Sequence, residues 1–350
     1  MTPQIHHVDH PAYYASAPKK PHRGPRRGRV ERYALIPYPE VTVPEVVVPE
    51  VLPPGSRLGD RYVVHELIGD GGMAMVYRGE HEILARPVAI KVLRSEAIDD
   101  TPAPLLRFVQ EARASSRIRH DNVVEVIDIG ETDDGRPFMV MEYLEGEELG
   151  VTLEREGPLP WSRVQPMLVQ ILAALQASHE QRLIHRDIKP QNLFRTQRMG
   201  YDDFIKVFDF GIAKATQSNM ALTLDGHTVG TPSYMSPEQC TGEPIDARSD
   251  IYSVGIVAYQ MLTGNLPFDG EEWAQAIFSQ LYEPVPSMAA ISPSVTVDPR
   301  IEAVIRRALA KNRDERFSSA REFADALMAI DSTAPTGLMS MLRRLFRGGR

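Results

Sequence analysis

A cluster of three glycines constrains the fold of this chain more than any other feature. Gly69, Gly71 and Gly72 follow an alternating segment, residues 62–68, that predicts a β-strand. A second predicted strand follows at residues 76–78 where the usual dinucleotide-binding arrangement requires a helix, so that arrangement is excluded. Glycine lets a backbone close over phosphate groups that a side chain would block. The cluster therefore indicates either a phosphate-covering loop or a plain hairpin turn.

The pattern of apolar residues predicts a small strand-rich part followed by a larger helical part. Strands are predicted at 87–93 and 138–143, with a helix at 104–119 between them. Further helices are predicted at 161–182, 250–263, 271–281, 299–310 and 319–330. The expected fold class is α+β, and ligands commonly bind in a cleft between two such parts.

Two charged residues follow the glycine cluster in an order that suggests phosphate binding. Lys91 ends an apolar strand, where its charge is costly unless it meets an anion. Glu111 lies on the next predicted helix and can hold the amine in place. Taken singly, each has a plain structural reading as an edge-strand lysine or a solvated helix charge. Their significance depends on the motifs that follow.

Two later motifs complete the ordered set. In the first, residues 185–192, Asp187 can accept the proton of an attacking hydroxyl. In the second, Asp209-Phe210-Gly211, the aspartate follows the apolar strand 205–208. Asn192 and Asp209 offer the hard oxygen ligands that magnesium prefers. Chance does not account for all of these motifs in this order.

Taken together, the motifs resemble the protein kinase family over about residues 62–330. The resemblance is closest to the bacterial, eukaryotic-like serine/threonine kinases, and it is carried by residues 69–77 and 230–239. It implies a two-lobed protein kinase fold with a nucleotide cleft between the lobes. The β-rich N-lobe would span about 58–143 and the helical C-lobe about 144–330.

The resemblance also implies roles for individual residues. Lys91 would contact the α- and β-phosphates of ATP and pair with Glu111, while Asp187 would be the catalytic base. Lys189 would stabilise the γ-phosphate. Asn192 and Asp209 would hold Mg²⁺, which Mn²⁺ could replace. The implied ATP-binding residues are Ile68, Gly69, Asp70, Gly71, Gly72, Met73, Ala74, Met75, Val76, Ala89, Lys91, Met141, Glu142, Leu144, Glu148 and Leu193.

Three residues have implied structural roles and three have implied regulatory roles. Glu238 would pair with Arg316, and Asp250 would brace the catalytic loop. Met73 and Met75, within the glycine-rich segment, are expected to face the nucleotide or solvent. The implied regulatory residues are Arg186, Thr223 and Thr228.

Regulation is expected to act on the activation loop, residues 209–238. Arg186 implies that a phosphorylated loop gathers onto a basic pocket. By position, Thr223 is the expected autophosphorylation site, with Thr228 as the alternative. Asp225 either supplies a weaker permanent charge or caps the loop, and both readings stay open.

The acceptor is expected to be a serine or threonine hydroxyl of a protein, in bacterial signal transduction. Lys189-Pro190 and Thr231 match the serine/threonine pattern of the family. Gln191 stands where kinases that favour basic sequences often carry glutamate, which argues against a strong arginine preference. A nucleotide-binding scaffold without turnover and a small-molecule phosphotransferase are weaker alternatives.

Composition limits the compartment and the partners. The formal net charge is −8 although both ends of the chain are basic, so nucleic acid is not an expected partner. No apolar run is long enough to span a membrane. Cys240 is the single cysteine, which fits a reducing compartment, and the expected location is the cytoplasm.

The two ends of the chain differ from its middle. Residues 1–57 are expected to be a disordered Pro/Arg-rich extension, within which Pro-Glu-Val recurs at 39–41, 44–46 and 49–51. Proline at every fifth position forbids a helix, which leaves a semi-stiff spacer or a docking strand. Residues 331–350 are expected to form a basic amphipathic tail, which would contact a membrane surface, dock on the protein or stay frayed. The sequence also leaves open whether the chain forms a dimer.

Overall fold

The computed structural model describes residues 50–95, 103–198, 200–210, 232–268, 270, 272–330 and 346. By its contacts the chain divides into Met1–Val47 and Val48–Arg350, and all described residues belong to the second unit. The expectations for Thr223, Asp225, Thr228 and Thr231 lie outside the described residues, as does almost all of the basic tail.

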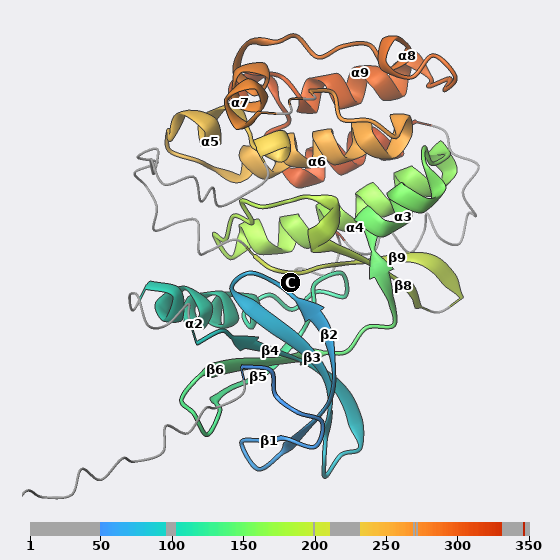
Figure 1. Ribbon diagram of the computed structural model, residues 1–350. Coiled ribbons are helices and arrows are strands. Elements are labelled where there is room, and N and C mark those ends of the chain that lie inside the picture. The colour runs from blue at the N-terminus through green and yellow to red at the C-terminus, as the bar shows by residue number, and fades with distance from the viewer. Residues whose placement is uncertain are drawn as a thin grey trace, which may run out of the picture. The chain divides into compact units, whose positions relative to one another are not determined.

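The N-lobe is built on a six-stranded antiparallel sheet in the order β1-β2-β3-β4-β6-β5 (Figure 1). Helix α2 (Ala103–Ser115) packs on the sheet through Phe108 and Ala112, which contact Leu93 and Met139. The strands are β1 (Arg57–Leu58), β2 (Tyr62–Asp70), β3 (Ala74–His81), β4 (Arg86–Leu93), β5 (Val126–Glu131) and β6 (Pro137–Glu142).

Strand register assigns each side chain of the sheet to one of two faces. Tyr77 lies opposite Ile90, which lies opposite Val140, and these residues belong to one buried apolar cluster. Val76 lies opposite Lys91, so both point to the other face, because successive side chains of a strand alternate. A one-residue slip would bury Lys91 in the apolar cluster, which fixes the register.

The C-lobe is mainly helical, with a small three-stranded sheet in the order β7-β8-β9. Helices α4 and α6 form its centre, and most of their residues are buried (Figure 1). The elements are β7 (Gly146–Glu148), α3 (Leu149–Glu156), α4 (Trp161–Glu180), η1 (Pro190–Asn192), β8 (Leu193–Arg198), β9 (Tyr201–Val207), η3 (Pro232–Tyr234), α5 (Pro237–Thr241), α6 (Ala247–Thr263), α7 (Trp273–Tyr282), α8 (Met288–Ile291), α9 (Pro299–Ala308), η4 (Arg313–Glu315) and α10 (Ala320–Met328).

Side-chain caps and glycine set the ends of several C-lobe helices. The carboxylates of Asp246 and Asp298 accept backbone N–H groups at the starts of α6 and α9, and the Ser319 hydroxyl does so for α10. Helix α6 ends at Gly264, whose φ of 74° suits glycine. The predicted helices are present, with ends that differ by a few residues. Among the described residues, none of the helices has the length and apolarity needed to cross a bilayer.

Residues 50–57, predicted as part of the disordered extension, pack on the N-lobe sheet. The backbone N–H of Leu52 donates to the Tyr77 hydroxyl at 3.0 Å, and the Leu52 side chain contacts the apolar cluster. The Gly55 N–H donates to the Val64 carbonyl at 2.8 Å. The packed domain therefore begins before residue 58.

One residue of the basic tail, Phe346, is described, and it lies against the C-lobe. Its carbonyl accepts a hydrogen bond from Arg321 at 2.9 Å, and its ring packs against the apolar core. This contact is of the kind expected for intramolecular docking. Contact of the tail with a membrane surface stays a prediction.

Candidate active site

Three charged side chains from different elements meet around Lys91. Lys91 on β4 donates to Glu111 on α2 at 3.1 Å and to Asp209 at 2.7 Å. Asp209 follows β9, so this contact joins the two lobes. The predicted pairing of Lys91 with Glu111 is thus present, and Asp209 is a second partner that sequence reasoning had assigned only to a metal.

The electrostatics of this cluster follow from one ammonium facing two carboxylates. Burial alone would lower the pKa of Lys91, but Asp209 and Glu111 outweigh it and raise that pKa above its usual value. Burial raises the pKa of Glu111 to about 7, against the opposing effect of Lys91. The negatively charged Asp209 adds to that rise. The cluster carries more negative charge than its one cation balances.

The residues of the predicted catalytic loop form a second cluster. The Asn192 amide nitrogen donates to the Asp187 carbonyl at 2.7 Å and to its carboxylate at 3.2 Å. Lys189 lies 3.2 Å from the same carboxylate. Asp187 and Lys189 each keep a fifth of their side-chain surface exposed, so a substrate can reach both.

Strand pairing brings Asn192 close to Asp209. Leu193 on β8 lies opposite Val207 on β9, and the Phe208 N–H donates to the Asn192 carbonyl at 3.2 Å. Because the Asn192 amide nitrogen donates to Asp187, the amide oxygen is the atom left to bind a cation. An amide oxygen and a carboxylate suit Mg²⁺, which binds through few protein ligands and takes the rest from phosphate and water. The donor set therefore fits a magnesium ion bound together with a nucleotide.

The backbone is held in an uncommon conformation at two residues of the predicted site, Arg186 directly before Asp187 and Asp209 after β9. Arg186 has a φ of 68° and Asp209 a φ of 53°, values that non-glycine residues adopt rarely. The Asp250 carboxylate accepts the N–H groups of His185 at 2.9 Å and Arg186 at 2.8 Å. His185 also contacts the Phe208 carbonyl at 3.1 Å. Asp250 thus braces the loop, and such strain is found at functional sites.

Residues predicted to surround the adenine lie on the Lys91 face of the N-lobe sheet and on β8 of the C-lobe. Ala89 lies opposite Met141, on the same face as Val76 and Lys91. Leu193, from the C-lobe, is fully buried. Ile68 is half exposed at the end of β2. Apolar residues predicted to surround the adenine thus come from both lobes.

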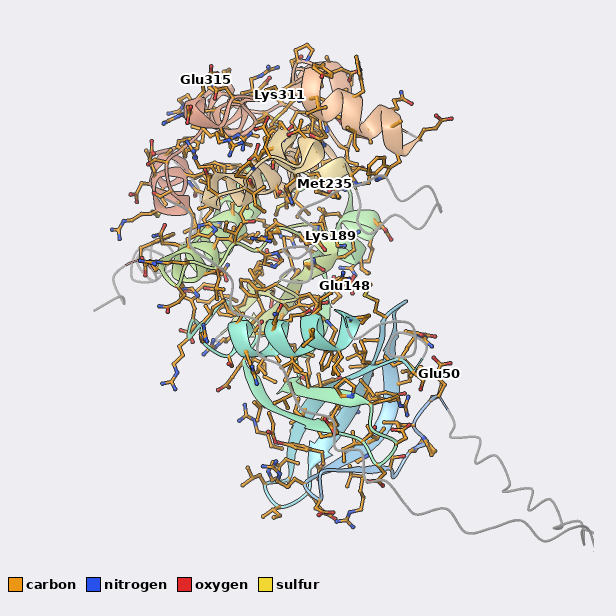
Figure 2. The ribbon with its side chains drawn as sticks, turned by 90° about the vertical axis from the view of Figure 1, so that its left-hand side faces the viewer. Glu50, Glu148, Lys189, Met235, Lys311 and Glu315 are labelled. Atoms are coloured by element: carbon orange, nitrogen blue, oxygen red, sulfur yellow. The ribbon has the colours of Figure 1, made fainter. Side chains whose placement is uncertain are left out.

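Glu148 ends β7 and lies near Asp209 and Lys189. Burial and the nearby Asp209 raise its pKa, while Lys189 opposes the rise. Figure 2 shows Glu148 and Lys189 together where the sheet meets the helices. The Glu142 carboxylate accepts hydrogen bonds from Lys206 at 2.5 Å and from the Glu125 N–H at 2.8 Å, and its own N–H donates to the Glu125 carbonyl at 3.0 Å. The contacts of Glu142 and Leu144 with the nucleotide stay predictions.

The expectation that Met75 faces the nucleotide or solvent is wrong. Its side chain is fully buried in the apolar cluster with Tyr77, on the sheet face away from Lys91. Alternation along β3 requires this, because Val76 points to the cleft. Met73, in the turn before β3, is half exposed as predicted. The Gly71 N–H donates to the Ala74 carbonyl at 3.1 Å, which closes the loop.

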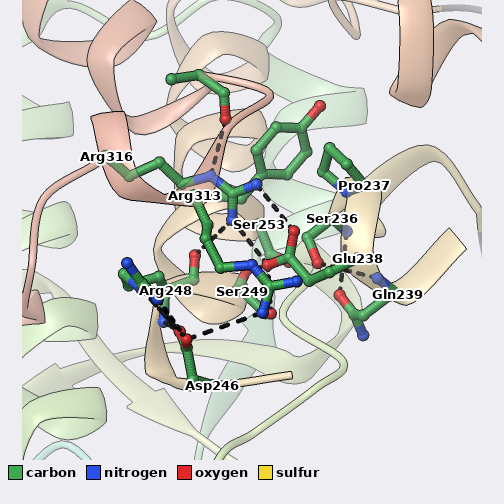
Figure 3. Close-up of polar contacts among 12 residues, drawn as sticks. Ser236, Pro237, Glu238, Gln239, Asp246, Arg248, Ser249, Ser253, Arg313 and Arg316 are labelled. Atoms are coloured by element: carbon green, nitrogen blue, oxygen red, sulfur yellow. Dashed lines mark hydrogen bonds and ion pairs between the residues drawn. The ribbon is translucent and has the colours of Figure 1, made fainter. Parts of the chain in front are cut away.

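The predicted ion pair between Glu238 and Arg316 is present and is buried (Figure 3). Two guanidinium nitrogens donate to the two carboxylate oxygens at 2.8 and 2.9 Å. Ser249 donates to Glu238 at 2.5 Å, and Arg316 also donates to the carbonyl of Ala310 at 2.8 Å. This pair joins α5, where the predicted activation loop ends, to the residue that follows η4.

Sequence reasoning missed two residues that support the catalytic loop. His179 on α4 lies 2.7 Å from Asp250, and Gln239 donates to the Arg186 carbonyl at 2.8 Å. The spacing Ser236-x-x-Gln239 is a visible signal, since it forms a capping box at the start of α5. No local pattern points to His179.

This fold and this arrangement of charged groups define a class, and comparison with known proteins identifies it. The protein kinase domain family matches residues 62–328, and the chain belongs to this family.

Its relatives include bacterial serine/threonine kinases. The chain is 42% identical over 280 residues to serine/threonine-protein kinase pkn3 of Myxococcus xanthus, covering 79% of this chain and 51% of that protein. It is 37% identical over 285 residues to PknB of Mycobacterium tuberculosis, covering 80% of this chain and 44% of that protein. The chain spans about half or less of these relatives.

Solved structures agree with the fold. The crystal structure of the Mycobacterium tuberculosis PknI kinase domain matches with a TM-score of 0.62 at 30% identity, covering 79% of this chain and 98% of that domain. The two-lobed kinase fold expected from the motifs is thereby confirmed.

Proposed function

We propose that this protein is an ATP-dependent serine/threonine protein kinase of bacterial signal transduction. The observation that carries the proposal is the contact of Lys91 with both Glu111 and Asp209, which joins the lobes at the site where the motifs expect phosphates. Family membership and relatives that are named serine/threonine-protein kinases support it. Because ATP is the donor, we propose the cytoplasm as its compartment.

The acceptor hydroxyl would be oriented by Asp187. The oxygen of the acceptor hydroxyl would form a bond to the γ-phosphorus. The bond between that phosphorus and the β–γ bridging oxygen would break at the same time, which leaves ADP. The hydroxyl proton would pass to the Asp187 carboxylate. Lys189, beside Asp187, would balance charge on the transferred group, and Lys91 would hold the α- and β-phosphates. Asn192 and Asp209 would hold Mg²⁺, which would neutralise charge on the phosphate oxygens.

Regulation through the activation loop is part of the proposal. Arg186 is half-buried, and burial lowers its pKa. An arginine in such a position gains from a phosphate partner, because charge-assisted hydrogen bonds offset the cost of burial. We propose Thr223 as the autophosphorylation site, with Asp225 a partial substitute for a second phosphate.

Phosphoryl transfer from γ-labelled ATP tests the proposal. The full chain, its Asp187→Asn variant and the surface control Asp121→Asn are incubated with Mg²⁺ and a generic acceptor protein. We expect Asp187→Asn to lower the rate by about 10²–10⁴-fold, the contribution typical of a positioned base, with the control unchanged. Equal labelling by wild type and Asp187→Asn would refute the mechanism. Phosphosite mapping of the same wild-type sample should find Thr223, and phosphate on Thr228 alone would contradict that assignment.

A further inference from the structure

Arg94, one residue beyond β4, binds the glycine-rich loop at three places. Its Nε donates to the Gly71 carbonyl at 2.9 Å, and one terminal nitrogen donates to the Asp70 carboxylate. Its backbone N–H donates to the Met73 carbonyl at 3.0 Å. One residue thus contacts both sides of the turn that the proposed function places over the phosphates.

The other terminal nitrogen of Arg94 donates to Glu50, which precedes the whole sheet. Glu50 belongs to the third Pro-Glu-Val repeat and lies outside the residues 62–328 that the kinase family matches. Figure 2 shows Glu50 on the strand-rich lobe. Arg94 is therefore a bridge between the glycine-rich loop and a segment outside the residues that the family model matches.

The backbone around Glu50 is fixed by side chains of the sheet. Arg136, with 2% of its side chain exposed, donates to the Glu50 carbonyl at 2.6 Å. The Tyr77 hydroxyl accepts the N–H of Leu52 at 3.0 Å. These anchors lie on β3 and at the start of β6, so the Glu50 carboxylate is presented from a rigid base rather than from the loop that it helps to hold.

This arrangement matters because arginine has a long side chain with many rotamers. Asp70 ends β2 and belongs to the glycine-rich segment itself, so its bond to Arg94 does not tie that segment to a further part of the lobe. Glu50 does fix the Arg94 side chain from outside the loop. The Arg94 side chain keeps only 17% of its surface exposed and that of Glu50 37%, so their contact is only partly screened by solvent.

We infer that Glu50 and Arg94 are positioning residues for the nucleotide, which hold the glycine-rich loop in the conformation that covers the phosphates. The segment before the kinase domain thereby tunes the affinity for ATP without touching it. This inference rests on the proposed function, since it assigns the loop to ATP.

The test measures ATP affinity in the full chain. Variants Glu50→Gln, Arg94→Gln and the double variant are compared with Glu45→Gln, which makes the same change in the preceding repeat. Binding of the Mg²⁺ complex of a non-hydrolysable ATP analogue gives Kd, and steady-state phosphorylation gives KM and kcat separately. We expect each single variant to raise Kd and KM by about two- to fivefold, the size typical of a partly exposed ion pair, with kcat within about twofold. The double variant should bind the analogue no more weakly than Arg94→Gln alone does, because the two residues act through one contact.

The outcomes separate this inference from the proposed function. Three results would overturn the inference. The Kd of Glu50→Gln could equal that of wild type, Glu45→Gln could raise Kd as much as Glu50→Gln does, or Glu50→Gln could lower kcat and leave KM unchanged. If Arg94→Gln does not fold, Glu50→Gln still decides, because its side chain lies at the surface. A wild type that binds no analogue overturns the proposed function instead. Urea unfolding of the nucleotide-free variants would then still measure the coupling between Glu50 and Arg94.

Discussion

Two ion-paired groups in this protein, one partly buried and one fully buried, differ in their balance of charge. In the cleft, the Lys91 ammonium faces the carboxylates of Glu111 and Asp209. In the C-lobe, the Arg316 guanidinium faces the single carboxylate of Glu238, and the remaining hydrogen-bonding capacity of both is used by neighbouring groups. One group has surplus negative charge, whereas the other is neutral and saturated.

The pKa shifts of the carboxylates have opposite signs in the two groups. Burial raises the pKa of Glu111 to about 7, and Lys91 does not cancel that effect. Burial would also raise the pKa of Glu238, but its hydrogen bonds and ion pair with Arg316 lower it below the usual value. Surplus charge at the cleft suits a site that receives cations with its ligand, while balanced charge suits a permanent support of the fold.

The largest effect is expected where the balanced pair is broken. Arg316→Met leaves the Glu238 carboxylate buried without a cation, which should lower the free energy of unfolding by about 3–5 kcal/mol. Urea denaturation of the nucleotide-free protein measures this change.

Arg313→Met is the matched control, because Arg313 lies in the same network but pairs with the largely exposed Glu243 (Figure 3). We expect that control to cost less than about 1 kcal/mol. Equal losses in the two variants would show that the burial of the Glu238 pair has no special energetic role.

A change to the Lys91 group should alter phosphoryl transfer rather than the free energy of unfolding. Asp209→Asn removes a carboxylate that both Lys91 and a bound metal would use, so we expect phosphoryl transfer to fall by about 10²–10³-fold. The free energy of unfolding without nucleotide should not fall, because the change relieves repulsion between Asp209 and Glu111. A loss of stability like that of Arg316→Met would contradict the comparison.

Much of the cleft could be predicted from the sequence because its residues are tied to local patterns. Lys91 lies within an apolar strand, Asp209 follows another, and Asn192 lies at a fixed spacing from Asp187. The same alternation that places Val76 in the cleft should have excluded Met75, so that error was avoidable.

The supports of the site could not be predicted in the same way. The contact of His179 with Asp250 joins residues 71 positions apart, and that of Glu50 with Arg94 joins residues 44 apart. Neither pair has a periodic signal, because side-chain contacts between distant segments are decided by packing. The Pro-Glu-Val repeat suggested a spacer, and only the fold shows that its third copy is anchored to the sheet.

The smallest effect is a difference in pH dependence between Glu111→Gln and Glu238→Gln. The pKa of Glu111 is raised from 4.5 to about 7, so its stabilising contribution is present below pH 4.5 and is lost as the pH rises through 7. Relative to wild type, Glu111→Gln should therefore gain about 2–3 kcal/mol between about pH 5 and about pH 8.

The pKa of Glu238 is lowered, so its contribution is present above pH 4.5 and is lost only as the pH falls below that value. Glu238→Gln should then differ from wild type by a constant amount between about pH 5 and about pH 8. Urea unfolding of nucleotide-free protein at both ends of the range measures the two differences. Parallel pH profiles for the two variants would mean that Glu111 is ionised throughout, and the surplus charge that distinguishes the cleft from the Glu238 pair would then have to be balanced by groups other than Lys91.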